Sequence, residues 1–370
     1  MIVKNESKVI ERCFNSFKDI VDAIVISDTG STDDTIAIME KWRVDNNKEG
    51  VIVSHEWKNF EHNRNMSLVS CLLWIHSLPA EKGLDHQIIF IDADDYVVID
   101  NPKTFLKQFE KFDYDRYMIN MRCGNSEYAR LFAVKAPKKG EKVVCKWEGV
   151  LHEYMNREGT TVNLSGGYIQ ASREGARSAD PMKYLKDALV LETALKETPD
   201  NSRYVFYLAQ SYRDYDGPLF KKMSEKLYLK RFEMGGWDEE RYISLVEAAK
   251  CRICRGKDDN KTAALLVKAF NFRPHRLEAP YFLVRHYRLN NNHIMGYAFG
   301  KSLVDLPWPK DSLFVNMDIH SWQFYDEVAI CASWAKDKEL YRRLCKRILA
   351  IPNLSQANHE RISRDLKIYG

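Results

Sequence analysis

The sequence predicts an α/β domain with a mainly parallel sheet, followed by an all-α domain of helical repeats. Up to about residue 180, short β-branched strands alternate with helices, the order that builds parallel sheets covered by helices. After "SADPMKYLKD", long amphipathic helices rich in Leu, Ala, Tyr, Lys and Glu take over. A chain of 370 residues exceeds one typical hydrophobic core, so we expect two domains, residues 1–178 and 179–370.

The first domain has strands and helices in β-α-β-α-β order. "DAIVISDTG" is a strand that ends at polar residues, and "TDDTIAIMEKW" has apolar residues at helical spacing. The strand "EGVIVSH", the helix "NRNMSLVSCLLWIHSL" and the strand "QIIFID" follow. In open α/β sheets the site lies at the carboxyl ends of the strands. Asp92, Asp94 and Asp95 follow the last of these strands, so we expect them at such an end.

A weak internal repeat marks the second domain. "FYLAQSYR" (206–213) matches "YFLVRHYR" (281–288), and "SLVEAAKC" (244–251) falls between them. This spacing sets Leu208, Leu245 and Leu283 at intervals near those of tetratricopeptide repeats, which are stacked helical hairpins. An ordinary helical bundle with chance similarity is the alternative.

Composition argues against several classes of protein. The chain is 45% hydrophobic and 29% charged, no apolar run could span a bilayer, and "MIVKNESKVIE" lacks the features of a signal peptide. We therefore expect a cytoplasmic protein without a membrane span. Among the eight cysteines only Cys251 and Cys254 have metal-like or redox-like spacing. In a helical segment with no second pair, they suit two packed thiols better than a zinc or redox site.

The net charge of +4 is unevenly distributed, because residues 1–180 are net acidic and residues 181–370 are net basic. A basic second half could attract an anionic acceptor, although solvated helix faces explain such charge more often.

The acids after "IIFI" need neutralising partners, because clustered carboxylates repel and are costly to desolvate. A solvated acidic turn is the simple alternative. Asp28 ends an earlier strand before a Gly/Ser/Thr turn that could offer backbone N–H groups to an anion, and Arg64 stands at a helix start, where it could bind phosphate. The D-x-D pair, Asp92 and Asp94, supplies hard oxygen ligands for Mg²⁺ or Mn²⁺. Together these groups suit a nucleoside diphosphate.

"MIVKNE", "DTGSTD", "NRN" and "FIDADD" appear in the order and spacing of a family 2 glycosyltransferase, which this chain resembles. "RLFAV" and "WEGVLHEYM" are similar to a segment of the lipopolysaccharide-core and protein-modifying branch. "RYVFYLAQSYRD" and "HRLEAPYFLVRHYRL" resemble the members that carry tetratricopeptide repeats. The resemblance implies a GT-A fold, a nucleotide-sugar donor, with UDP expected, and an inverting transfer of a hexose assisted by Mn²⁺ or Mg²⁺.

The resemblance also implies site residues. Those expected to bind the nucleotide sugar are Lys4, Asn5, Asp28, Arg64, Asp92 and Arg177. The expected metal ligands are Asp94, Asp92 and His152. A later position that is often His in the family is Gln170 here, which removes one candidate ligand and gives His152 more weight. A histidine hydrogen-bonded inside the fold is the alternative for His152. Asp95 could bind a sugar hydroxyl, but capping the next turn is preferred.

The catalytic base is expected to be Glu153, with Glu148 as the second choice. His152 and Glu153 cannot both face the site in a regular strand, because neighbouring side chains alternate, so the two assignments compete unless the backbone bends. Arg177 lies in "SREGARSADP", which suits either a phosphate lid or a plain linker between domains.

The acceptor stays open at this stage. A protein, a saccharide and a hydroxylated DNA base are all chemically possible, and helical repeats favour an extended polymer. "RPHRLEAPYFLVRHYRLNNN" mixes arginines with aromatics, which permits nucleic acid, but its aromatic residues also fit the core of the repeats. The rival hypothesis is an inactive helical-repeat scaffold or binding protein.

Overall fold

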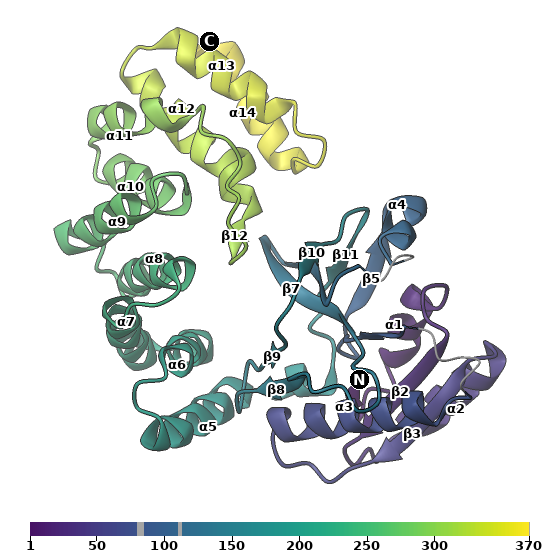
Figure 1. The fold of residues 1–370 in the computed structure, drawn as a ribbon. Coiled ribbons are helices and arrows are strands. Elements are labelled where there is room, and N and C mark those ends of the chain that lie inside the picture. The colour runs from purple at the N-terminus through teal and green to yellow at the C-terminus, as the bar shows by residue number, and fades with distance from the viewer. Residues whose placement is uncertain (80–84, 110–112, 370) are drawn as a thin grey trace. The chain divides into compact units, whose positions relative to one another are not determined.

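The computed structural model describes residues 1–79, 85–109 and 113–369, and the chain divides into two compact units, Met1–Glu197 and Thr198–Gly370. The first is the α/β unit and the second is helical (Figure 1). The predicted fold class is thereby confirmed. The unit boundary falls later than the predicted 178/179, because the first long helix, α5 (Lys183–Glu197), packs within the α/β unit although its composition resembles that of the helices that follow.

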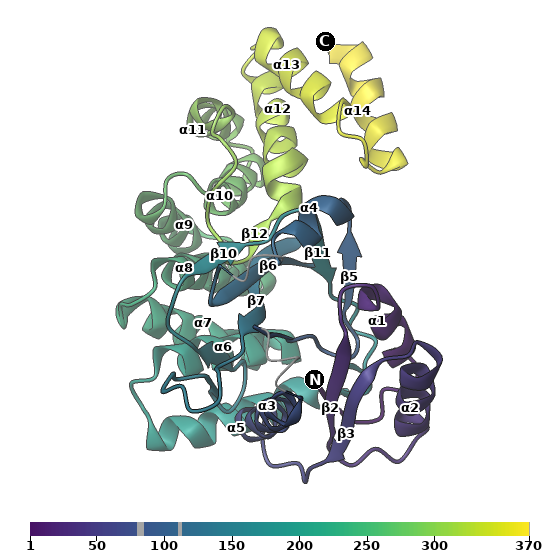
Figure 2. The same ribbon diagram turned by 45° about the vertical axis from the view of Figure 1, so that its right-hand side comes forward.

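The α/β unit opens with a parallel sheet in the order β1-β2-β3. Its strands are β1 (Ile2–Val3), β2 (Ala23–Asp28) and β3 (Glu49–Ser54). The helix α3 (Phe60–Ser77) contacts all three strands, while α1 (Ile10–Phe17) and α2 (Thr35–Asp45) pack together on the other side (Figure 2). The carboxyl ends of the strands therefore meet at one edge, where Asp28 ends β2 and where Asn5 and His55 lie just beyond β1 and β3.

A second, mixed sheet has the order β7-β6-β11-β5, with β10 paired to β6 and β4 paired to β7. Strand β4 (Gln87–Ile89) is antiparallel to β7, whereas the sequence pattern predicted "QIIFID" in the parallel sheet. The other elements are listed with their bounds: β5 (Tyr96–Ile99), α4 (Pro102–Lys107), β6 (Arg116–Cys123), β7 (Ser126–Lys135), β8 (Lys146–Glu148), β9 (Tyr154–Asn156), β10 (Thr161–Asn163), β11 (Gly167–Gln170) and η2 (Ala176–Ala179).

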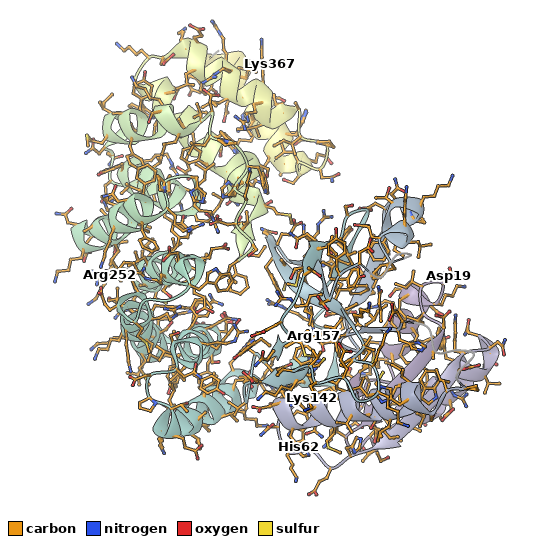
Figure 3. The ribbon with its side chains drawn as sticks, in the orientation of Figure 1. Asp19, His62, Lys142, Arg157, Arg252 and Lys367 are labelled. Carbon is orange, nitrogen blue, oxygen red and sulfur yellow. The ribbon has the colours of Figure 1, made fainter. Side chains whose placement is uncertain are left out.

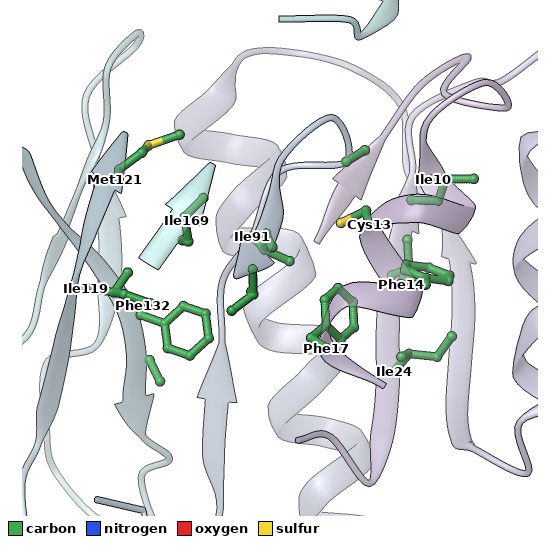
Figure 4. Close-up of a cluster of buried hydrophobic side chains, with 14 of the residues drawn as sticks. Ile10, Cys13, Phe14, Phe17, Ile24, Ile91, Ile119, Met121, Phe132 and Ile169 are labelled. Atoms are coloured by element: carbon green, nitrogen blue, oxygen red, sulfur yellow. The ribbon is translucent and has the colours of Figure 1, made fainter. Parts of the chain in front are cut away.

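One hydrophobic core joins α1 to both sheets (Figure 4). Phe14 and Phe17 of α1 are buried in it together with Ile91, Ile119 and Phe132. Burying these side chains contributes roughly 1.5–3 kcal/mol each. Because Ile91 is fixed in this core, the acid that follows it, Asp92, is held at a defined place.

The second unit is a succession of helices in which each packs against the next from α6 to α14. Its elements are α6 (Ser202–Tyr215), α7 (Pro218–Glu233), α8 (Asp238–Cys254), α9 (Asn260–Phe272), α10 (Glu278–Leu289), α11 (His293–Gly300), η3 (Lys301–Leu303), β12 (Val315–Asn316), η4 (Ile319–Gln323), α12 (Phe324–Trp334), α13 (Lys338–Leu349) and α14 (Gln356–Tyr369). Leu208, Leu245 and Leu283 lie on α6, α8 and α10, and all three are buried. The spacing predicted from sequence thus falls on every second helix, as stacked hairpins require. Assignment to the tetratricopeptide class stays a prediction.

Ion pairs connect neighbouring helices of this unit. Arg252 of α8, labelled in Figure 3, pairs with Glu225 of α7 at 3.1 Å and with Asp259, the N-cap of α9, at 2.8 Å. Cys251 and Cys254 are free thiols on α8, the first buried and the second exposed. Within the described residues, no helix combines the length and apolar character needed to cross a bilayer.

Candidate functional site

The predicted acid cluster forms a tight turn between β4 and β5. The backbone N–H of Asp95 donates to the carbonyl of Asp92 at 3.1 Å, which closes the turn. Asp95 is buried, whereas Asp92 and Asp94 are partly exposed. Asp95 therefore faces the interior, and the D-x-D pair is the part of the cluster that a ligand can reach.

An unbroken chain of ion pairs runs through this turn. Arg130 donates to Asp95 at 3.2 Å and to Asp92 at 2.7 Å. The other oxygen of Asp92 accepts from Arg64 at 2.7 Å, and Arg64 also pairs with Glu153. The order is Asp95, Arg130, Asp92, Arg64, Glu153, with signs alternating along the chain. The partners that the acid cluster needs are therefore two arginines.

The two arginines fix the protonation of the acids. Burial opposes ionisation of Asp92, but Arg130 and Arg64 outweigh it and hold the pKa of this carboxyl well below its usual range. Burial, and then the charge of Asp92, raises the pKa of Asp95 well above its usual range. Two neighbouring acids whose pKa values are shifted in opposite directions are typical of functional sites.

Arg130 is the site residue that the sequence analysis missed. The register of β4 and β7 pairs Ile89 with Ala133, and the same antiparallel register continued past the end of β4 sets Asp92 opposite Arg130. The signal was a charged residue inside the apolar strand "RLFAV". Recognising its partner required the strand pairing, which sequence patterns alone do not show.

The two candidate bases differ in their surroundings. Glu153 keeps one oxygen on the Nε of Arg64, and only 9% of its side chain is exposed. Glu148 accepts from Asn156, from Lys146 and from Tyr154 at 3.0, 2.8 and 2.7 Å. These donors lower the pKa of Glu148 to about 2, which makes it a weak base. The geometry favours Glu153.

The backbone bends between the two candidate bases. His152 has a positive φ of 53°, and it lies between the end of β8 at Glu148 and the start of β9 at Tyr154. The alternation of a regular strand therefore does not apply to His152 and Glu153. The two assignments no longer exclude each other, and both stay predictions.

The turn after β2 is held by its own side chains. Asp28, which is buried, accepts from the backbone N–H of Gly30 at 2.9 Å and from that of Ser31 at 3.1 Å. Asn5, in the left-handed region with φ 57°, accepts from the N–H of Thr32 at 2.7 Å. These amides are engaged inside the turn, so it suits a base or ribose better than an anion. Lys4 is exposed beside it.

The segment that follows β11 lies against Asp94. Gly175 donates its N–H to the Asp94 carboxylate at 3.3 Å, and Ser172 donates to the Asp94 carbonyl at 2.6 Å. Arg12 of α1 holds this segment by donating to Ser172 at 2.9 Å and pairing with Glu174 at 2.5 Å. The segment predicted as a phosphate lid or a linker therefore lies on Asp94 of the D-x-D motif, and its role as a lid stays a prediction.

The same segment continues to Arg177 and contacts Glu6. Arg177 pairs with Asp187 of α5, and its guanidinium lies 4.7 Å from the centre of the Phe60 ring. Glu6 accepts from the N–H of Ala176 at 3.3 Å. Burial, together with the charges of Asp94, Asp33 and Asp92, raises the pKa of Glu6 to about 7.

The donor set partly fits the expected divalent ion. Among the described residues, no group of three or more His, Cys, Asp or Glu side chains is placed to hold a metal. Mg²⁺ and Mn²⁺ sites of nucleotide enzymes usually need only one or two carboxylates, because substrate phosphates and water complete the shell. Asp94 suits this role, since its carboxylate is partly exposed and accepts one long hydrogen bond from Gly175. Asp92 is a weaker candidate, because each of its oxygens accepts from an arginine.

Comparison with known proteins agrees with this geometry. The model of the family "Glycosyl transferase family 2" matches residues 1–70, which include Lys4, Asn5, Asp28 and Arg64. Residues 1–70 carry a family 2 glycosyltransferase sequence. This match confirms the resemblance for the motifs that lie within residues 1–70, and the GT-A fold of the α/β unit stays a prediction.

Curated relatives point the same way. An uncharacterized glycosyltransferase of Rickettsia conorii is 30% identical over 139 residues, 36% of this chain and 43% of that protein. The SPbeta prophage-derived glycosyltransferase SunS of Bacillus subtilis is 36% identical over 226 residues, 57% of this chain and 47% of that protein. The chain thus spans less than half the length of the curated relatives it matches.

Among solved structures, residues 1–349 of S. aureus TarS align with 85% of this chain and 97% of that chain, at 15% identity and a TM-score of 0.33. A likeness of this size supports no conclusion about function.

Proposed function

We propose that this protein is a metal-dependent, inverting glycosyltransferase that moves a hexose from a nucleotide sugar, with UDP as the expected nucleotide, to a hydroxyl of a polymeric acceptor. The observation that carries the proposal is the ion-pair chain, which joins Asp92 of the D-x-D pair to Glu153 through Arg64. Residues proposed to bind the donor and the residue proposed as the base are thus linked by ion pairs, in a chain whose first 70 residues match a glycosyltransferase family.

Each part of the donor is assigned to particular residues. Asp28, Asn5 and Lys4 surround the turn assigned to the base and ribose, while Arg64, Asp92 and Arg177 are assigned to the ribose and diphosphate. Asp94, with Asp92 and His152 as further candidates, would hold Mn²⁺ or Mg²⁺. The ion would neutralise charge that develops on the departing diphosphate.

The transfer is a single displacement. Glu153 takes the proton of the acceptor hydroxyl while the acceptor oxygen forms a bond to the sugar C1. The bond between C1 and the diphosphate oxygen breaks, and its electron pair leaves with the diphosphate. Because attack comes from the face opposite the leaving group, the anomeric configuration inverts.

The nucleic-acid alternative gains no support from the segment that suggested it. Arg276 is buried and pairs with Glu278 at 2.8 Å and with Asp311 at 3.0 Å, while Arg288 pairs with Glu327. These arginines form ion pairs within the helical unit. A protein or glycan acceptor is therefore preferred over DNA, and the acid cluster with its arginines argues against an inactive scaffold.

Thermal unfolding with UDP tests the proposal. UDP with Mn²⁺ at 100 times its Kd should stabilise the protein by about 2.7 kcal/mol. Asp94→Ala should keep the fold and lose the Mn²⁺-dependent part of this effect, while Asp100→Ala, an exposed acid after β5, should behave as wild type. Absence of any stabilisation of well-folded wild type by UDP and Mn²⁺ would refute the proposal. Screening UDP-hexoses in the same way would then identify the sugar.

A further inference from the structure

Two cations and a buried acid share one face at the start of α5. Lys183 and Asp187 are four residues apart on this helix, so their side chains lie on the same side of it. Arg177, from η2, reaches the same place and donates to Asp187. Lys183 is partly buried, whereas the nearby Lys186 is exposed and pairs with Asp180 at 2.6 Å. The face is therefore distinct from the solvated side of the helix.

The ion pair of Arg177 and Asp187 is uneven in its burial. Only 10% of the Asp187 side chain is exposed, against 46% of the Arg177 side chain. Burial raises the pKa of Asp187, and Arg177 and then Lys183 oppose that rise. The acid therefore depends on its cations to stay charged, while nearly half of the Arg177 side chain is accessible to a ligand in solution.

The cations, in turn, carry more positive charge than Asp187 alone can balance. Burial, followed by the neighbouring charges of Arg177 and Arg173, lowers the pKa of Lys183, and Asp187 and Asp94 oppose this only in part. A doubly charged anion would balance two cations better than one carboxylate does, and an arginine can hold phosphate oxygens through two parallel hydrogen bonds.

The position of the face relative to the acid turn identifies the anion. Gly175, whose N–H meets the Asp94 carboxylate, stands two residues before Arg177. Arg177 also lies over Phe60, the first residue of the helix that carries Arg64. The cations thus adjoin the two elements assigned to the metal and the diphosphate.

We propose that Lys183 and Arg177 together bind the diphosphate of the donor, and that Asp187 is the internal counter-ion that the diphosphate replaces. This inference rests on the proposed function and extends it to Lys183 and Asp187. Arg177 exchanges one anion for another, so its charge is compensated both with and without the nucleotide. Asp187 competes with the diphosphate for the two cations, and this competition assists the release of UDP after transfer.

Because Asp187 competes with the diphosphate, its replacement should change the affinity in the direction opposite to replacement of either cation. UDP binding to the full chain is measured by calorimetry with Mn²⁺ present, and inorganic pyrophosphate serves as a second probe. Lys183→Gln and Arg177→Gln should each weaken binding of both probes by about tenfold, which corresponds to about 1.4 kcal/mol. Asp187→Asn should tighten binding by at least about threefold, because the competitor is gone. Lys186→Gln, a lysine of the same helix on the exposed side, should bind as wild type.

The outcomes separate this inference from the proposed function. If wild type binds UDP but Lys183→Gln binds it equally well, or if folded Asp187→Asn binds it no tighter, the inference is wrong and the function stands. If Asp187→Asn does not fold, Lys183→Gln and Arg177→Gln decide. If wild type binds pyrophosphate with the expected variant effects but not UDP, the cation site stands and the function fails. Binding of neither probe by wild type refutes both.

Discussion

Arg130 of β7 and Asp92, in the turn between β4 and β5, form an ion pair at 2.7 Å. Only 19% of the Arg130 side chain is exposed, and Arg130 also holds Asp95 at 3.2 Å. Its role is to position two acids, one of which belongs to the D-x-D motif. This pair is the part of the candidate site with the clearest consequences for stability.

Arg130→Gln should destabilise the protein by about 3–5 kcal/mol, because it leaves the buried Asp95 without its cation, while the partly exposed Asp92 keeps Arg64. Chemical denaturation measures this directly. Adding Asp95→Asn should recover part of the loss, since the side chain at position 95 can then carry no charge. Arg122→Gln on the neighbouring β6, whose side chain is 40% exposed and paired with Glu127, should cost less than about 1 kcal/mol. Equal costs for the two arginines would contradict the role given to Arg130.

Glu153→Gln should lower the rate of donor hydrolysis, and of transfer once an acceptor is known, by about 10² to 10⁴-fold, with little change in UDP affinity. Glu148→Gln should change the rate by no more than about threefold, because three donors already keep this carboxylate from accepting a proton. Single-turnover kinetics with the UDP-hexose found by screening measure both. The reverse ranking would move the base to Glu148.

Gly175→Ala should weaken binding of UDP with Mn²⁺ by about tenfold. A Cβ at this position would come within 2.9 Å of the Asp94 Oδ2 and 3.1 Å of its Cβ, so the lid segment or Asp94 must shift. Overpacking of this kind costs about 1–3 kcal/mol. Ser178→Ala, in the same segment, should bind normally. Unchanged binding by Gly175→Ala would show that the segment does not need to lie on Asp94.

Glu6→Gln should stabilise the protein at pH 8 by about 1 kcal/mol and have little effect at pH 5. The pKa of Glu6 is about 7 in the folded protein, above the ordinary value of 4.5, so the folded state binds more protons between these values. Stability is therefore lost as the pH rises through this window, and the glutamine variant avoids the loss. Denaturation curves at the two pH values test this, with the exposed Glu11→Gln as control. A stabilisation independent of pH would exclude the titration of Glu6 as its cause.

The sequence predicted what depends on local pattern. Strand and helix periodicity located β2, α2, β3 and α3, and the spaced leucines located every second helix of the second unit. It did not predict that β4 pairs with β7, because antiparallel pairing depends on contacts between segments far apart in the chain. Arg130 was missed for the same reason.

Other differences arise from competition among nearby groups. Glu148 and Glu153 look equivalent in sequence, and only the structure shows that Asn156, Lys146 and Tyr154 surround the first. The acid turn was predicted to need neutralising partners, and the structure supplies Arg64 and Arg130. The partner of Arg177, Asp187, lies beyond the predicted domain boundary, where composition changes but packing does not.

The ion-pair chain also sets an order of events during synthesis. Arg64 precedes Glu153 by 89 residues, and Asp92 and Arg130 are made between them. A nascent chain can complete the family 2 segment, residues 1–70, long before the last partner of Arg64 exists. Until then the guanidinium of Arg64, which is buried in the folded unit, lacks its acidic partners. The candidate site should therefore be among the last parts of the α/β unit to become resistant to protease during translation.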